Sequence, residues 1–460
     1  MKKMAIVLAA GKGTRMKSNL PKVAHEVLYK PMISHVVDVL KEMKVDRIVV
    51  VVGHKAEVVQ GILKDSVEYV WQTEQLGTGH AVMMAKDLLK DEEGVTFVLC
   101  GDAPLVRKET LDGLLAAHEE AGNKATLMSA NCDTSKAYGR IIRNENGVQG
   151  IREFKDCTPE EKMITEMNCG EYAFDNKALF ASLDKITNNN AANEYYLTDV
   201  IEILGSQGEK VGSYVIDDFN EVGGINSKLD LAEANKMLQK RINREHLING
   251  VTIIDPDNTY IARDVKIGAD TIIEPGCILK GNTVIGENCH IGPYCEFTNV
   301  TVYDNVEIKF SVLSDTVVES YTDIGPYARF RNNCHLHEHV HVGNFVEMKN
   351  ADFGNGSKCA HLSYIGDASV GDNVNIGCGT ITSNYDGKNK FRTTIGNNVF
   401  VGCNSNLVAP VTLEDDAYVA AGSTITKDVP SWTFAIARER QVNKEDYAKV
   451  LKEKRENLKK

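Results

Sequence analysis

The chain has 460 residues, enough for two or three domains with substantial cores. It carries 52 Lys and Arg residues against 64 Asp and Glu residues, and the net charge of −12 argues against a general nucleic-acid or anionic-membrane binder. No apolar run is long enough to cross a bilayer. The 11 cysteines form no C-x-x-C pair, so we expect reduced thiols in a cytoplasmic protein.

An apolar segment, residues 5–10, runs directly into the loop Gly11-Lys12-Gly13-Thr14-Arg15. A short signal sequence is one interpretation, but the cations that follow at once favour a buried first strand. A strand that ends in a glycine-rich, basic loop can hold phosphates, because backbone N–H groups approach closely. The loop matches neither the Walker pattern nor the dinucleotide fingerprint, which disfavours a dehydrogenase. A purely structural strand–helix turn remains the alternative.

Further strands are expected at 47–52, 67–71 and 96–100, with helices at 80–89 and 110–121 between them. This alternation predicts a mostly parallel sheet, whose ligands bind beyond the carboxyl ends of the strands. Two segments fall at that edge. Residues 72–79 carry amides and glycines suited to a planar base, and Asp102 ends a strand, where it would either bind Mg²⁺ or cap a turn.

After Asp102 the pattern becomes more antiparallel. Asn146-Gly147 is typical of a hairpin turn. A strand is expected at 167–174, a helix at 196–204 and a long helix at 228–247, where apolar residues recur at helical spacing. We therefore predict a first domain at 1–228, a linker helix at 229–250 and a second domain at 251–460.

From about residue 265 to 429 an aliphatic residue returns every six positions, as at Ile273, Leu279 and Ile285. This period matches the hexapeptide repeat of a parallel β-helix. The period breaks between Tyr303 and Val318, which predicts an irregular coil. The polar segment 383–392 also interrupts it and would form either a binding loop or a merely solvated one. The tail, residues 442–460, is polar, basic and helix-prone.

The opening motif, residues 8–16 with Pro21-Lys22, is similar to the signature of sugar-phosphate nucleotidylyltransferases. Segments 343–349, 361–367, 375–377 and 384–387 are more specific. Together they resemble the bacterial bifunctional N-acetylglucosamine-1-phosphate uridyltransferase/glucosamine-1-phosphate N-acetyltransferase family over essentially the whole chain. The resemblance implies an α/β Rossmann-like nucleotidyltransferase domain followed by a left-handed parallel β-helix, in a homotrimer that supplies UDP-N-acetylglucosamine for the bacterial cell envelope.

For the first domain the resemblance implies that UTP and N-acetylglucosamine 1-phosphate give UDP-N-acetylglucosamine and pyrophosphate. Arg15 and Lys22 would be catalytic, and Asp102 and Asn226 would bind Mg²⁺. Its position alone would equally make Asn226 a helix cap. The implied nucleotide and sugar contacts are Leu8, Ala9, Ala10, Gly11, Lys22, Gln72, Gly77, Thr78, Cys100, Gly101, Asp102, Gly139, Glu153, Asn168 and Asn226. Cys100 departs from the family, which often has Tyr there.

For the second domain the resemblance implies acetyl transfer from acetyl-CoA to glucosamine 1-phosphate. His361 would be the general base, since imidazole accepts a proton near neutral pH, and Glu347 would orient it. A structural histidine is the alternative. The implied sugar-phosphate contacts are Arg331, Lys349, Tyr364, Asn375 and Lys390. The implied acetyl-CoA contacts are Cys378, Asn384, Tyr385, Cys403, Ala421 and Arg438, with cysteines at 378 and 403 where the family has smaller or hydroxylated residues.

Two other functions compete with this interpretation. The first is a single-activity sugar-1-phosphate nucleotidyltransferase with a regulatory or structural β-helix, which the intact motifs around Lys349, His361 and Lys390 disfavour. The second is a regulatory assembly subunit, which would not need to retain Arg15 or Asp102.

Overall fold

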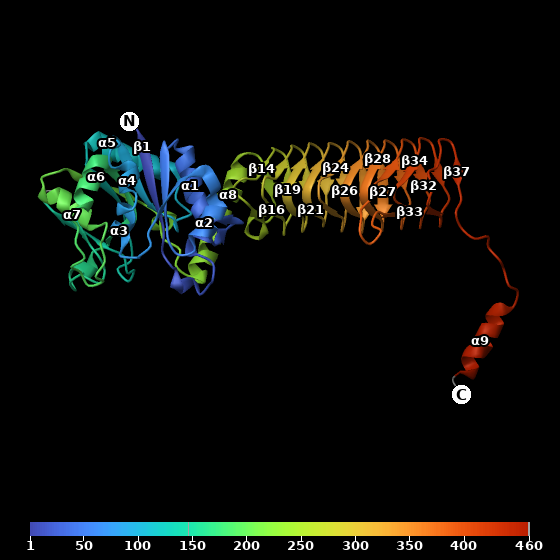
Figure 1. The fold of residues 1–460 in the computed structure, drawn as a ribbon, viewed down its shortest axis with the longest axis horizontal. Coiled ribbons are helices and arrows are strands. Elements are labelled where there is room, and N and C mark those ends of the chain that lie inside the picture. The colour runs from blue at the N-terminus through green and yellow to red at the C-terminus, as the bar shows by residue number, and fades with distance from the viewer. Residues whose placement is uncertain (146, 459–460) are drawn as a thin grey trace. The chain divides into compact units, whose positions relative to one another are not determined.

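The apolar run near the N-terminus forms β1 (Lys3–Ala9), an interior strand of the sheet in the computed structural model of the chain (Figure 1). The structure describes residues 1–145 and 147–458. These form two units, residues 1–238 and 239–460, and the division falls inside α8 (Lys228–Ile248). Within the described residues no helix is both long and apolar enough to span a membrane.

The core of the first unit lies on both faces of this sheet. β1 pairs in parallel with β4 (Arg47–Val52) and β6 (Val95–Cys100), and β4 pairs with β5 (Glu68–Trp71). Alternate residues of β1 enter two separate cores, which explains why the whole strand is apolar. One core includes α1 (Met32–Glu42), α2 (Ala56–Leu63) and α5 (Lys108–Ala121); the other includes α3 (Thr78–Met83), α4 (Lys86–Leu89), α6 (Asn176–Leu183) and α7 (Asp199–Ser206).

Beyond β6 the sheet contains antiparallel as well as parallel strands, which confirms the prediction that the strands after Asp102 become more antiparallel. β10 (Glu166–Asp175) runs antiparallel to β6 and to β7 (Ala125–Asn131). Three more strands complete this end of the sheet: β8 (Arg140–Asn144), β9 (Gly147–Arg152) and β11 (Val211–Ile216). A separate two-stranded sheet is formed by β2 (Glu26–Val27) and β3 (Lys30–Pro31). Asn146 of the expected hairpin turn lies outside the described residues.

Two helix predictions were inaccurate. The helix expected at 80–89 is divided into α3 and α4, because Met84 and Ala85 donate to carbonyls three residues back and tighten the backbone. The helix expected at 196–204 begins only at Asp199.

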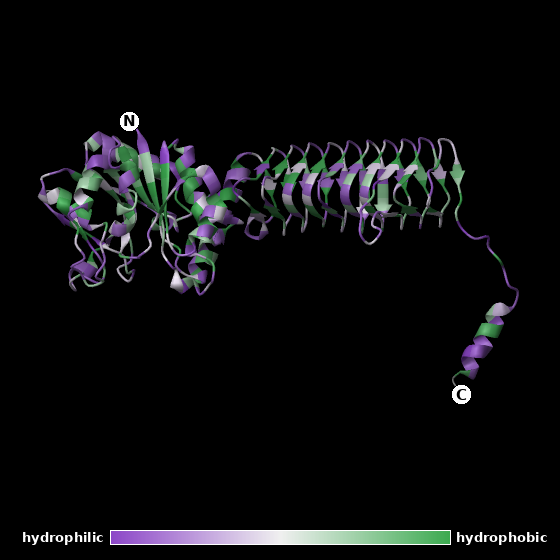
Figure 2. Ribbon diagram, in the orientation of Figure 1, coloured by the Kyte–Doolittle hydropathy of each residue, from purple (hydrophilic) through white to green (hydrophobic). Residues whose placement is uncertain are grey.

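The second unit is a parallel β-helix, in which apolar residues recur coil after coil (Figure 2). One sheet contains β12 (Thr252–Ile253), β15 (Ile272–Ile273), β18 (His290–Ile291), β20 (Glu307–Ile308), β22 (Asp323–Ile324), β25 (His341–Asn344), β27 (Lys358–His361), β29 (Asn375–Ile376), β32 (Phe400–Val401), β35 (Tyr418–Val419) and β37 (Phe434–Ala435). The repeat residues point inward as predicted: Ile273, Leu279 and Leu336 are fully buried.

A second sheet covers two further faces of the coils. It contains β13 (Tyr260–Ile261), β14 (Lys266–Ile267), β16 (Ile278–Lys280), β17 (Val284–Ile285), β19 (Glu296–Val302), β21 (Val312–Val318), β23 (Arg329–Arg331), β24 (Cys334–Leu336), β26 (Glu347–Phe353), β28 (Tyr364–Val370), β30 (Ile381–Ser383), β31 (Thr393–Ile395), β33 (Asn406–Val408), β34 (Val411–Leu413) and β36 (Thr424–Ile425). Its long strands turn between the faces at left-handed Asn or Asp residues, such as Asn299 (φ 55°) and Asn350 (φ 48°).

Strand pairing shows that the coils differ in length. Ile272 pairs with His290 on the next coil, whereas Glu307 pairs with Asp323 across a shorter interval of the chain, which confirms the predicted irregular coil. The interval from Asn375 to its partner Phe400 is longer than either. The extra residues form the orange hairpin that projects from the coils in Figure 1, held by the bond from Phe391 N to Asn384 O at 2.9 Å. After the last coil the tail contains α9 (Tyr447–Asn457).

Candidate active sites

A pocket of about 280 Å³ opens at the carboxyl ends of β1, β5 and β6. This is the edge where a parallel sheet binds its ligands. The structure brings together here the predicted residues Leu8, Ala9, Ala10, Gly11, Lys22, Gln72, Gly77, Thr78, Cys100 and Asp102. Four further lining residues were not predicted: Val23, Gln75, Ala81 and Glu194.

Two glycines allow the walls of this pocket to approach closely. Gly13 has φ 60°, and a Cβ there would lie 2.5 Å from Lys22 Cβ. Gly77 has φ 113°, and a Cβ there would lie 2.5 Å from the Tyr195 carbonyl oxygen. A larger residue at position 13 would displace Lys22, and one at position 77 would displace the segment around Tyr195.

The four residues predicted for phosphates and metal form one cluster. Lys22 Nζ contacts the Asp102 carboxylate and lies 2.6 Å from Asn226 Oδ1. Arg15 donates to the same Asn226 oxygen at 2.8 Å. Two cations therefore converge on a carboxylate and an amide oxygen contributed by segments that lie far apart in the chain.

Asn226 does not cap α8, although its position made that plausible. The Ser227 hydroxyl accepts from Asp230 N at 3.2 Å, while the Asp230 carboxylate accepts from the backbone of Ser227 and Asn226 at 2.8 and 2.9 Å. Ser227 and Asp230 thus form a reciprocal cap of the helix. The Asn226 side-chain oxygen is left to face Arg15 and Lys22.

Gln72 is buried beside the pocket with its amide held in one orientation. Its Nε2 donates to Gly77 O at 3.0 Å and lies 3.1 Å from His80 Nδ1. The nearby Thr78 hydroxyl accepts from Leu197 N at 3.1 Å. With Nε2 engaged, Gln72 Oε1 is the atom left to accept a hydrogen bond from a ligand.

The predicted sugar contacts Gly139 and Asn168 are neighbours, and neither they nor Glu153 line the pocket. Asn168 N donates to Gly139 O at 2.9 Å, and Asn168 Nδ2 donates to the Tyr172 hydroxyl at 2.7 Å. Glu153 accepts from the Thr198 hydroxyl at 3.3 Å, and burial raises the pKa of Glu153. Gly101, beside the pocket, donates from its backbone to Leu8 O at 3.0 Å.

The sequence did not predict a role for Glu171, because a Glu within a strand is expected to point outward to solvent. It is 1% exposed, and neither carboxyl oxygen has a hydrogen-bond partner among the described residues. Burial raises the pKa of Glu171 well above its usual range, and the charge of Asp102 adds to the shift. Burial likewise raises the pKa of the Cys100 thiol. Burial therefore favours the neutral form of both groups, next to a cluster that carries charge.

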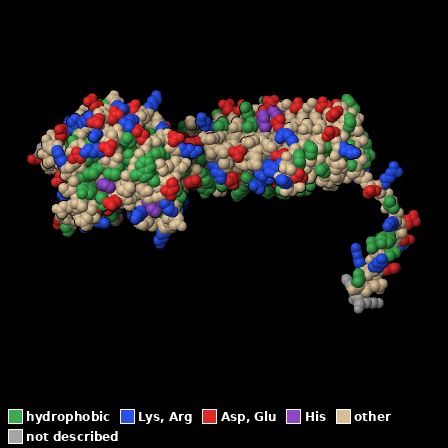
Figure 3. All heavy atoms as spheres, in the orientation of Figure 1, with side chains coloured by type: hydrophobic (Ala, Val, Ile, Leu, Met, Phe, Trp, Pro, Cys, Tyr) green, Lys and Arg blue, Asp and Glu red, His purple; other side chains and the backbone are tan. Residues whose placement is uncertain are grey.

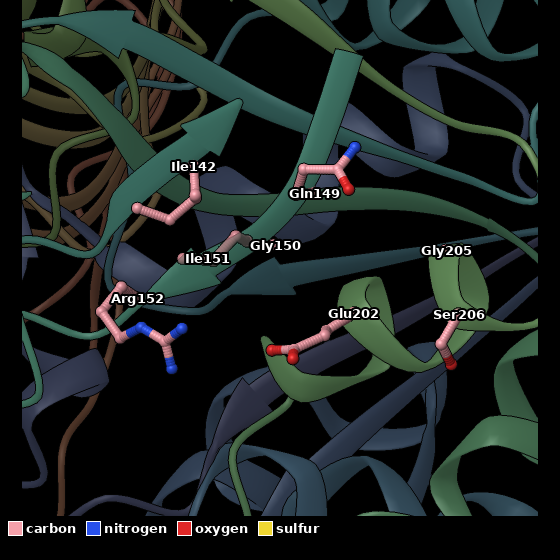
Figure 4. Close-up of a pocket in the computed structure, with 8 residues that line it drawn as sticks. All are labelled: Ile142, Gln149, Gly150, Ile151, Arg152, Glu202, Gly205 and Ser206. Carbon is pink, nitrogen blue, oxygen red and sulfur yellow. The ribbon is translucent and has the colours of Figure 1, made fainter. Parts of the chain in front are cut away.

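A second hollow, of about 300 Å³, lies between β9 and α7 in the same unit. Arg152 and Glu202 face each other across it in Figure 4. None of the predicted site residues lines this hollow, so it is separate from the pocket at the strand ends.

In the β-helix, three cationic side chains predicted for the sugar phosphate are neighbours. Arg331 and Lys349 occupy paired positions on β23 and β26. Lys390, at the base of the projecting hairpin, is close enough that Lys349 lowers its pKa. Lys349 is only 7% exposed and lies 3.2 Å from Asp367, whose carboxylate also contacts Asn350 and Asn384. Like charges held together in this way favour a bound anion.

His361 ends β27, and its orienting partner differs from the prediction. Its Nδ1 lies 3.0 Å from Asn344 Oδ1 on the neighbouring coil. An amide oxygen only accepts, so Nδ1 carries the proton and Nε2 is the basic nitrogen. The prediction gave this role to Glu347, but Glu347 accepts from Arg331 at 2.7 and 3.0 Å. Which of Asn344 and Glu347 faces His361 depends on the register between neighbouring coils, and the six-residue repeat alone does not fix that register.

Three of the predicted acetyl-CoA contacts form a row on successive coils. Asn404 N donates to Cys378 O at 2.7 Å, and Gly422, next to Ala421, donates to Cys403 O at 2.8 Å. The other three are more dispersed: Asn384 is held by Asp367, while Tyr385 on the hairpin and Arg438 beyond β37 are exposed. Of the remaining sugar contacts, Tyr364 pairs with Glu347 across the coils, and Asn375 begins β29.

Comparison with known families agrees with the division of the chain into two units. A nucleotidyl transferase family matches residues 4–240. A GMPPB C-terminal domain matches residues 261–353, and a bacterial transferase hexapeptide family (six repeats) matches residues 392–427. Fold and sites thus define a nucleotidyl transferase joined to a hexapeptide-repeat unit.

Relatives extend over the full length of the chain. It is 52% identical to the bifunctional protein GlmU of Listeria welshimeri, over 98% of this chain and 99% of that protein. It is 51% identical to the bifunctional protein GlmU of Geobacillus sp. (strain WCH70) and 52% identical to that of Brevibacillus brevis, each over 98% of both chains. The chain belongs to the bifunctional GlmU family.

Proposed function

We propose that the protein makes UDP-N-acetylglucosamine, a cell-envelope precursor, in two steps. The β-helix transfers the acetyl group of acetyl-CoA to glucosamine 1-phosphate. The N-terminal unit then transfers the uridylyl group of UTP to N-acetylglucosamine 1-phosphate and releases pyrophosphate. The observation that favours this over a single-activity nucleotidyltransferase is the convergence of Arg331, Lys349 and Lys390 on the β-helix, because a merely structural β-helix has no need of an anion site.

In the uridylyl step, a phosphate oxygen of the sugar phosphate attacks the α-phosphorus of UTP as pyrophosphate leaves. This chemistry needs positioning and charge neutralisation. Arg15 and Lys22 supply the cations, and Gln72 Oε1 accepts from the base. Gly139, Glu153 and Asn168 are the proposed contacts of the sugar.

Mg²⁺ is the proposed cofactor of this step. Asp102 and Asn226 fit it, because one ammonium already contacts oxygens of both side chains and Mg²⁺ favours oxygen ligands. When bound, the ion would neutralise charge on the phosphates of UTP.

In the acetyl step, the amine of glucosamine 1-phosphate attacks the thioester carbonyl carbon. His361 Nε2 accepts the amine proton as the C–N bond forms, and the C–S bond then breaks to release CoA. Arg331, Lys349 and Lys390 hold the phosphate, while Tyr364 and Asn375 bind the sugar. Acetyl-CoA lies along Cys378, Cys403 and Ala421, with Asn384, Tyr385 and Arg438 nearby. We propose a cytoplasmic homotrimer, with the division 1–228, 229–250 and 251–460 between the two functions.

A paired endpoint assay tests the proposal. Purified protein receives glucosamine 1-phosphate and acetyl-CoA, with or without UTP and Mg²⁺, and both free CoA and pyrophosphate are measured. We expect CoA without UTP, and pyrophosphate only when UTP and Mg²⁺ are added. Pyrophosphate only from ready-made N-acetylglucosamine 1-phosphate, without CoA release, would instead support the single-activity nucleotidyltransferase.

A further inference from the structure

Three successive coils of the β-helix place two histidines and two carboxylates side by side, and none of these four residues is assigned to either reaction. Glu319 directly follows β21, His335 lies on β24 with His337 just after it, and Asp352 lies on β26. The pairing of Val317 with His335 and of His335 with Asp352 fixes their order along the stack. Histidine side chains reach the surface of the β-helix among acidic ones in Figure 3.

The local geometry follows from strand periodicity. Leu336 points into the core and is fully buried, so His335 and His337 both point outward, with ring centroids 4.1 Å apart. Backbone bonds hold the coils in register, from Glu319 N to Leu336 O at 2.8 Å and from His337 N to Phe353 O at 3.0 Å. The pairing of the coils thereby fixes the backbone positions of the residues that carry the candidate metal ligands.

Both imidazoles direct a nitrogen at the same carboxylate oxygen. Glu319 Oε1 lies 2.7 Å from His335 Nε2 and 3.3 Å from His337 Nδ1. One ligand atom from each of these three residues lies within 4.8 Å of the others. Around a tetrahedral zinc ion with bonds of about 2.0–2.1 Å, neighbouring ligand atoms are about 3.4 Å apart. Small side-chain movements therefore suffice to surround such an ion.

Asp352 is placed to orient the second histidine. Its Oδ1 lies 3.0 Å from His337 Nε2, on the far side of the ring from Glu319. A carboxylate that accepts from one imidazole nitrogen fixes the tautomer in which the other nitrogen can bind a metal. Asp352 Oδ1 also lies 3.8 Å from His335 Nδ1.

We propose that Glu319, His335 and His337 bind a divalent transition-metal ion, with Zn²⁺ the best match to two imidazoles and one carboxylate, and that Asp352 orients His337. The fourth coordination position faces solvent, since all four side chains are partly exposed. A bound ion would link the coil of Glu319 to the coil of the two histidines. The site is distinct from the acetyl site: Lys349 and Asp352 share β26 but lie on different faces, separated by the left-handed Asn350.

The test is Zn²⁺ titration of the full-length protein in excess Mg²⁺, which occupies oxygen-donor sites. We expect wild type to bind one more Zn²⁺ than His335→Ala or His337→Ala, and Zn²⁺ to raise the Tm of wild type but not of these two variants. Asp352→Asn should weaken binding by about 10–100-fold. With Co²⁺, the difference spectrum should lack a thiolate band, which separates this site from the cysteines.

His290→Ala is the matched control. His290 is as exposed as His335 and lies 3.0 Å from Glu274 and 3.9 Å from Glu307, but no second histidine joins it in the contacts of the described residues. This variant should bind as much Zn²⁺ as wild type, and acetyl transfer should be retained in all these variants as a check on folding. The proposal is overturned if wild type binds no extra Zn²⁺, or if His290→Ala loses as much as His337→Ala.

Discussion

At the residue scale, the proposed general base His361 and its hydrogen-bond partner Asn344 can be tested together. His361→Ala should lower kcat for acetyl transfer by about 10²–10⁴-fold, because the amine then has no base to accept its proton. Asn344→Ala should lower kcat by about tenfold, since one hydrogen bond no longer selects the tautomer. Steady-state kinetics at several pH values would measure both effects.

Glu347→Gln is the informative comparison for Asn344→Ala. Because Glu347 contacts Arg331, its loss should raise KM for glucosamine 1-phosphate more than it lowers kcat. A large loss of kcat in Glu347→Gln, with Asn344→Ala unaffected, would restore the orienting role to Glu347.

The buried carboxyl of Glu171, beside the N-terminal site, should make the stability of the folded protein depend on pH. Its pKa is raised in the folded state, so the folded protein binds more protons than the unfolded chain above about pH 4.3, and stability falls as pH rises through this range. Glu171→Gln should remove this loss. We expect a higher Tm than wild type at neutral pH, by roughly 2–4 °C per kcal/mol relieved, and a smaller gain near pH 4. A gain that is independent of pH would show that Glu171 is not the titrating group.

At the scale of elements, the hairpin inserted after β30 brings Lys390 close to Lys349, where we propose that the sugar phosphate binds. Lys390→Ala should raise KM for glucosamine 1-phosphate by about tenfold or more, because a charge-assisted hydrogen bond to phosphate is lost. Lys388→Ala is the matched control, since Lys388 is exposed on the same hairpin and its backbone contacts Asp386. Equal effects of the two substitutions would argue for general attraction by the hairpin's charge instead of a contact of Lys390.

Repeats and strands could be predicted from the sequence, whereas contacts between coils could not. β4 covers the expected residues 47–52, and the inward residues of the β-helix follow the six-residue period. The partner of His361 lies one coil away, and the length of a coil is not constant even outside the insertion. A shift of one residue changes the facing side chain, so Asn344 could not be chosen over Glu347.

In the N-terminal site, too, contacts between distant segments could not be predicted from the sequence. Its glycines and Asp102 follow strand ends and were predictable by position, but Glu171 lies within β10, which the sequence marks only as a strand. Its burial depends on the antiparallel pairing of β10 with β6, and local periodicity does not reveal this contact.

At the scale of the whole molecule, two sites that act in sequence on a freely released intermediate should be separable. Asp102→Asn should abolish uridylyl transfer and keep acetyl transfer, and His361→Ala should do the reverse. The central measurement combines these two variants in one reaction with glucosamine 1-phosphate, acetyl-CoA, UTP and Mg²⁺.

We predict that neither variant alone forms UDP-N-acetylglucosamine and that the mixture does, because N-acetylglucosamine 1-phosphate made by one variant reaches the other. No product from the mixture, or loss of both activities in a folded His361→Ala protein, would contradict two independent sites in this chain.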